Sequence, residues 1–127
     1  MEKFRDVTHH HLQINHEIIY GEVTVNEIIE HRWKVMTNEG FHDDYKILVD
    51  VRDARFINFL DDLPFFMEYI NKASKCFNLN RKCAFITSSP EHVAFAEILK
   101  SHLAEVENHY IINVFSTESA ALNWLLK

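Results

Sequence analysis

Apolar positions along the chain alternate between two spacings. Short runs such as "EIIYGEV", "YKILVDV", "KCAFIT" and "YIINVF" are rich in β-branched and aromatic residues, which indicates strands. Between these runs, apolar residues recur at three- and four-residue intervals, the spacing of one helix face. A further strand-like run, "FRDVTHHHLQI", lies near the start, and Asn15 and His16 are the predicted turn of a tight hairpin. The pattern therefore predicts the order β-β-α-β-α-β-α-β-α.

Residues typical of helix N-termini stand where the predicted helices begin. Thr24 lies three residues before Glu27, the spacing of a capping box. Ser89 precedes a proline and an acid, and Ser116 or Thr117 precedes the last apolar stripe. The remaining helix is expected to open at "DDLP", near its second aspartate. We expect each helix to begin within a few residues of these positions.

The strands read as nearly continuous apolar runs, which is typical of a parallel sheet covered by helices. The opening hairpin adds an antiparallel element. Only two Gly and two Pro occur in 127 residues, so no stretch has the composition of an interdomain linker. We therefore predict one α/β domain over residues 1–127, with a mostly parallel sheet, an N-terminal antiparallel hairpin and right-handed crossovers.

Composition excludes several classes of protein. The hydrophobic fraction of 47% with 25% charged residues is that of a globular protein. A net charge of −6 disfavours nucleic acids and anionic membranes, because binding to either relies on Lys and Arg. No run has the length of a membrane span or the pattern of a signal peptide, so we expect a cytoplasmic protein. Cys76 and Cys83 lack metal or redox spacing and are expected to be free thiols.

Four blocks carry a family resemblance. In their order, "EIIYGEVTVNEI", "ILVDVRDARF", "AFITSSPEHVAFAEIL" and above all "VFSTESAALNWL" resemble the SpoIIAA-like proteins, a branch of the STAS superfamily. The likeness extends over nearly the whole chain, and its closing block is the most specific. It implies the STAS-type, SpoIIAA-like fold. It also implies a role in regulation or in binding a small or lipid-like ligand.

The phosphorylation switch of the best-known STAS proteins is not expected in this chain. In anti-sigma-factor antagonists a serine at a helix start receives the phosphoryl group. The corresponding position falls at "NFLD", and no Ser or Thr occurs between Thr37 and Ser74. No hydroxyl is therefore available at that place to gain the charge through which phosphorylation acts.

Polar side chains follow three of the predicted strands. In an open α/β sheet the ligand crevice lies outside the carboxyl ends of the strands, which in this chain are "DVRDAR", "TSSP" and "FSTES". The candidate residues are Asp50, Arg52, Asp53, Arg55, Ser88, Ser116 and Thr117. In one interpretation the arginines and free helix N–H groups bind a small anion. In the other, which we favour, the hydroxyls cap helices and the charged residues pair with one another.

The run "THHH" raises the question of a metal. Side chains alternate along a strand, so His9 and His11 would share one face, with His16 nearby across the hairpin. Zinc takes three or four ligands, and no suitably spaced cysteine or acid completes the set. The expectation is therefore that the protein has no metal and no cofactor. An exposed strand edge bearing polar residues is the ordinary explanation of these histidines.

No catalytic residue is assigned, because glycine-rich phosphate loops and recognisable nucleophile-base spacings are missing from the sequence. We expect a noncatalytic regulatory or binding domain for a protein partner or a small ligand, with anionic and lipid-like ligands among the options. The alternative is a small cytoplasmic enzyme that uses the strand-end crevice. The exposed edge of the hairpin needs protection, which favours a homodimer.

Overall fold

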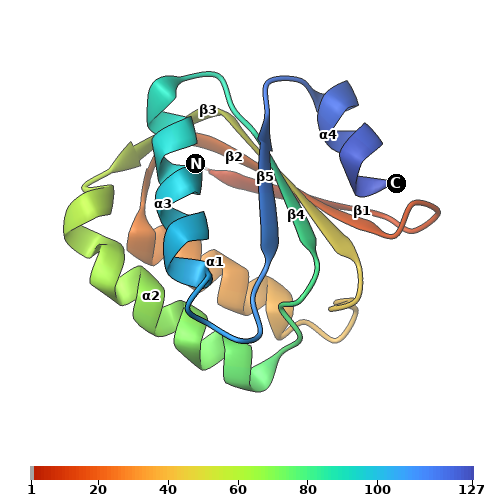
Figure 1. The fold of residues 1–127 in the computed structure, drawn as a ribbon, viewed down its shortest axis with the longest axis horizontal. Helices are drawn as coiled ribbons and strands as arrows, with labels where there is room; N and C mark the ends of the chain where they lie inside the picture. The colour runs from red at the N-terminus through yellow and green to blue at the C-terminus, as the bar shows by residue number, and fades with distance from the viewer. Residues whose placement is uncertain (1) are drawn as a thin grey trace.

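The computed structural model describes residues 2–127, which form a five-stranded sheet with helices on both faces (Figure 1). The elements follow the predicted order. They are β1 (Phe4–His9), β2 (Ile14–Thr24), α1 (Val25–Met36), β3 (Lys46–Ile57), α2 (Phe59–Cys76), β4 (Lys82–Ile86), α3 (Pro90–Leu103), β5 (Ile111–Phe115) and α4 (Glu118–Leu125). None of these helices is long and apolar enough to cross a membrane.

The sheet has its strands in chain order, with β1 antiparallel to β2 and all other neighbours parallel. Each of α1, α2 and α3 connects one parallel strand to the next in the same direction. Right-handed crossovers of this kind place all three helices on one face, and their side chains form the larger core with that face. The last helix, α4, follows β5 and covers the opposite face (Figure 1).

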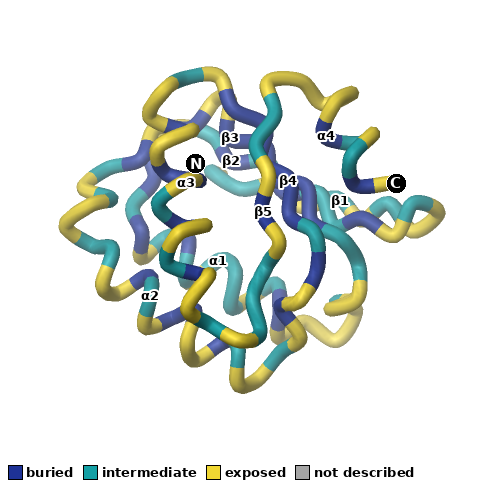
Figure 2. Tube along the Cα trace, in the orientation of Figure 1, coloured by how far each residue is buried: buried dark blue, intermediate teal, exposed yellow. Residues whose placement is uncertain are grey.

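The two faces of the sheet alternate along each strand. Ile47 and Val49 of β3 point into the larger core, whereas Leu48 points to α4. There it packs with Ala121 and Leu125, both of which are fully buried. Figure 2 shows the buried residues gathered on the central strands and on the inward sides of the helices. Helices therefore cover both faces of the sheet, as its apolar strands predict.

The predicted helix caps at three positions are confirmed. The Glu27 N–H donates to Thr24 Oγ1 at 3.2 Å, and the Thr24 N–H donates back to Glu27 Oε1 at 3.0 Å. Ser89 and Thr117 each accept a backbone N–H of the following helix. The second helix begins at Phe59, within the margin of the prediction. Its proline accordingly lies inside the helix rather than in the first turn.

The predicted hairpin turn is wrong. The first strand ends at His9 and the second begins at Ile14, so the turn spans residues 10–13. Gln13 adopts a left-handed conformation, with φ of 57°. Ile14 is fully buried beneath α4, so β2 must already be in register at that residue and the turn falls on the residues before it, all of which are exposed except the half-buried Leu12. His11 therefore lies in the turn and not on the strand.

The third strand is longer than predicted. It continues to Ile57 because its second half pairs with β2 as far as Thr24, past an irregularity between Ile18 and Tyr20. As a result, the segment "RDAR" is part of a strand and not a loop after one. Several of the predicted site residues are thereby distributed along β3.

Candidate functional site

The strand-end residues predicted from the sequence meet only in part. The Arg52 guanidinium donates to both carboxylate oxygens of Asp50, Nε to Oδ1 at 3.0 Å and Nη2 to Oδ2 at 2.7 Å. Burial alone would raise the pKa of Asp50, but the hydrogen bonds from Arg52 hold it below its usual value. The Ser88 hydroxyl donates to the Arg52 carbonyl at 2.8 Å. These three residues form one hydrogen-bonded network in which the arginine is already paired.

The other predicted residues lie apart from this network. Asp53 and Arg55 are exposed on the second half of β3, and Arg55 Nη1 lies 4.0 Å from the exposed Glu22. Thr117 caps α4, since its Oγ1 accepts the Ala120 N–H at 3.2 Å, and Ser116 is exposed beside it. The Thr117 contact is therefore a helix cap, and the Arg55–Glu22 contact is an exposed charge pair.

Two of the three predicted histidines come together. His9 Nε2 lies 3.3 Å from His16 Nδ1, whereas His11 meets the His9 ring edge-on, with centroids 6.5 Å apart. His16 Nε2 is buried without a hydrogen bond and lies 4.0 Å from a carboxylate oxygen of Glu118. Burial lowers the pKa of His16 more than Glu118 raises it.

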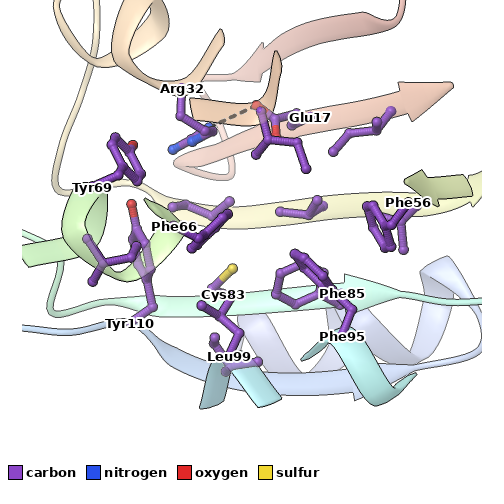
Figure 3. Close-up of a pocket in the computed structure, with 17 residues that line it drawn as sticks. Glu17, Arg32, Phe56, Phe66, Tyr69, Cys83, Phe85, Phe95, Leu99 and Tyr110 are labelled. Atoms are coloured by element: carbon purple, nitrogen blue, oxygen red, sulfur yellow. Dashed lines mark hydrogen bonds and ion pairs between the residues drawn. The ribbon is translucent and has the colours of Figure 1, made fainter. Parts of the chain in front are cut away.

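A cavity of about 60 Å³ lies elsewhere, between the sheet and helices α1 to α3. Its walls are mostly aliphatic and aromatic side chains, among them Ile28, Val49, Phe66, Phe85, Phe95 and Leu99. Figure 3 shows Phe85 and Phe95 toward one end of the cavity, with Arg32, Tyr69 and Tyr110 toward the other. The cavity is therefore apolar along most of its length and polar at one end.

The polar end is built on a buried ion pair. Arg32 Nη1 donates to Glu17 Oε2 at 3.0 Å, and the two side chains are only 11% and 4% exposed (Figure 3). Burial alone would lower the pKa of Arg32, but the Glu17 carboxylate raises it, so the guanidinium stays charged. Arg32 Nη2 is buried and has no hydrogen-bond partner. A polar neighbour of Arg32 at this end is Tyr69, whose pKa Arg32 lowers against the effect of burial, and no acceptor among the described residues meets Nη2 in hydrogen-bond geometry.

Glu17 and Arg32 also line a groove of about 540 Å³ beside β1. Asp6, Glu17 and His31 meet there, and their metal-binding atoms lie within 4.8 Å of one another. His31 Nε2 is 2.6 Å from Asp6 Oδ2, however, and Arg32 pairs with Glu17. The close contact of His31 with Asp6 and the Glu17–Arg32 ion pair account for this cluster, so we assign no metal to it. Glu17 and Arg32 line both the groove and the cavity, so the pair lies between the two.

The cavity was not predicted from the sequence, because its lining residues have the apolar pattern of an ordinary hydrophobic core. Two weak signals pointed to it. Alternation along "EIIYGEV" places Glu17 on the same face as the buried Ile19. Arg32 interrupts the apolar stripe of α1, four residues after Ile28. Paired charges on two buried faces are unusual, and such a pair marks the polar end of the cavity.

No protein-family model matches the chain, and no curated protein matches it. Among solved structures, it is similar to an uncharacterised protein of the DUF3478 family from Shewanella loihica PV-4, which is described as having a SpoIIAA-like fold. The likeness covers 88% of this chain and 83% of that one, with a TM-score of 0.53 and 14% sequence identity. This likeness establishes the fold, so the chain has the SpoIIAA-like fold that its sequence blocks implied.

Proposed function

We propose that the chain is a single noncatalytic domain that binds a small, largely apolar molecule in the cavity between the sheet and helices α1 to α3. The observation that carries this proposal is the free Arg32 Nη2 donor at the polar end of an otherwise apolar cavity. Pockets of this composition, apolar with a few polar groups that orient the ligand, are typical of small-molecule sites.

The volume of the cavity limits its ligand. About 60 Å³ accommodates roughly four to six water-sized groups at about 10–15 Å³ each. A molecule of about four to six non-hydrogen atoms therefore fits, and a long acyl chain does not. An empty cavity of this size costs about 1.4 kcal/mol at ~24 cal/mol per Å³. A ligand that fills it would offset that cost and stabilise the fold.

The contacts at the strand ends support a noncatalytic role over the enzyme alternative. Arg52 and Asp50 are engaged with each other, and Ser88 donates to a backbone carbonyl. None of these contacts is the nucleophile-to-base hydrogen bond on which covalent catalysis depends. A ligand that bound at this crevice and was chemically changed would favour the alternative.

Isobutanol is a suitable probe for the cavity, because it has five non-hydrogen atoms and a hydroxyl acceptor. In a ¹⁵N–¹H NMR titration we expect it to bind with a Kd in roughly the high micromolar to millimolar range. Cys83 lines the cavity and Cys76 is exposed, which gives a matched pair of variants. Cys83→Met adds two carbons inside the cavity and should abolish binding, whereas Cys76→Met should preserve it. Equal binding by both variants would place the ligand elsewhere and refute the proposal.

The proposal extends to a homodimer in the cytoplasm. The first strand lies at the edge of the sheet, with no strand beyond it among residues 2–127, and its outer N–H and C=O groups are open to a second copy. A cytoplasmic location suits two free cysteines. Light scattering should give twice the chain mass at high micromolar concentration, and proline at an outward N–H of β1 should give the monomer. A monomeric wild-type protein would contradict the dimer.

A further inference from the structure

Arg81 is a buried cation that contacts no carboxylate. Only 6% of its surface is exposed, and its guanidinium carbon lies 5.3 and 5.7 Å from the ring centroids of Phe41 and Tyr110. Its Nη1 donates to the backbone carbonyl of Asp43, and Tyr110 is its other polar neighbour, but Nε and Nη2 meet no acceptor of the described residues in hydrogen-bond geometry. The Asp43 carboxylate accepts the Asn78 N–H instead. Burial lowers the pKa of Arg81, as expected for a charge with little compensation.

Arg32 lines the cavity, whereas Arg81 lies behind the lining residue Tyr110, so that its charge acts on the same end. Burial raises the pKa of the cavity-lining Cys83 thiol to about 12, and the positive charges of both arginines oppose that rise. Tyr110, another lining residue, lies beside the Arg81 guanidinium and also near enough to Arg32 to affect its pKa. The two arginines thus share these neighbours.

The charges at this end do not balance. Glu17 is the one acid among the buried residues of the described chain that faces the larger core. The other buried acid, Asp50, follows Leu48 by two residues on the face that α4 covers, and it pairs with Arg52. Two buried guanidinium groups against one carboxylate leave a net charge of +1. Three buried N–H-bearing atoms, Nη2 of one arginine and Nε and Nη2 of the other, also lack acceptors.

We propose that the cavity takes a short-chain monocarboxylate, with its carboxylate at the polar end beside Arg32 and Tyr110, where the charge of Arg81 acts from behind Tyr110, and its hydrocarbon group among the phenylalanines. This inference rests on the proposed function and adds the chemistry of the head group. One negative charge brings the polar end to neutrality, and its oxygens accept from Arg32 Nη2, the unpartnered donor that lines the cavity. A ligand with a neutral head group would leave the net charge of +1 uncompensated, and a dianion would turn it into a net negative charge. A ligand with an ammonium group would be repelled by the arginines.

Isobutyrate and isobutyramide test the head group, because they match in size and shape and differ in charge. Each is titrated at pH 7 into the full chain, by calorimetry and by ¹⁵N–¹H NMR. We expect isobutyrate to bind at least tenfold more tightly, a difference of about 1.4 kcal/mol. Equal affinities would overturn the monocarboxylate inference and leave the cavity proposal standing. If isobutanol, isobutyrate and isobutyramide all fail to bind, the proposed function itself is refuted.

Variants at two arginines test whether the preference for isobutyrate over isobutyramide arises from the charge at the polar end of the cavity. Arg81→Gln should weaken isobutyrate at least tenfold and change isobutyramide less than twofold. Arg55→Gln removes the same charge from an exposed site on β3 and should leave both affinities within twofold. A loss of isobutyrate binding in Arg55→Gln as large as in Arg81→Gln would mean that net charge alone attracts the anion, which would overturn the inference. The wild-type comparison of the two ligands decides the matter even where Arg81→Gln is unstable.

Discussion

Removing one partner of the buried Glu17–Arg32 pair should be far more damaging than removing both. At the observed 3.0 Å between Arg32 Nη1 and Glu17 Oε2, Coulomb's law with an effective dielectric constant of about 20 gives about 5.5 kcal/mol of attraction. Much of this offsets the desolvation of two nearly buried groups. A single replacement loses the attraction while the remaining charge stays buried.

We expect Arg32→Met and Glu17→Met each to lower the free energy of unfolding by about 3–5 kcal/mol. The double variant removes both charges of the pair, leaves Arg81 as it is in the wild type and keeps similar side-chain volumes, so it should lie within about 1–2 kcal/mol of the wild type. Urea unfolding at pH 7, followed by far-UV circular dichroism, gives all four free energies and therefore the coupling energy of the pair.

An exposed pair provides the control for this cycle. Arg55 and Glu22 lie 4.0 Å apart with side chains 73% and 68% exposed, and their replacement should change the unfolding free energy by less than about 1 kcal/mol. If the losses in the Glu17 and Arg32 variants simply add in the double variant, the two side chains do not act as a pair. That result would refute the assignment of a buried ion pair to the polar end of the cavity.

Three further outcomes are expected. Burial lowers the pKa of His16, so below about pH 6.5 the unfolded chain binds more protons than the folded one, and the free energy of unfolding falls as the pH drops. In equilibrium unfolding across this range, the free energy of unfolding of His16→Gln should fall less steeply than that of the wild type. A disulfide reagent should label Cys76 in the folded protein and label Cys83 only after unfolding, because burial raises the pKa of the Cys83 thiol to about 12. Thr117→Ala should lower the unfolding free energy by about 1 kcal/mol, whereas Ser116→Ala should leave it nearly unchanged in the same assay.

The order of elements could be predicted because local signals agree with the fold. The capping box at Thr24 and the caps at Ser89 and Thr117 depend on residues within one turn, and the structure has them as predicted. The ends of the strands were harder to predict from the sequence. The hairpin turn depends on the burial of Ile14 beneath a helix more than a hundred residues later, and the length of β3 depends on its pairing with β2. Such tertiary contacts leave no local pattern.

The cavity could not be predicted for a related reason. Its walls consist of residues that any core would contain, and a volume of about 60 Å³ is the space left between packed side chains. The sequence does show that Glu17 and Arg32 fall on buried faces, but not that they meet. For Arg81, which directly precedes a buried strand, nothing in the sequence indicates that no carboxylate reaches it.

Intermolecular nuclear Overhauser effects between isobutyrate and the protein test the central claim most directly. The methyl protons of isobutyrate should show contacts to side-chain protons of Phe66, Phe85 and Leu99, which line the cavity. Contacts to Ser88 and Thr117 in their place would put the ligand at the strand-end crevice and contradict the cavity as the binding site.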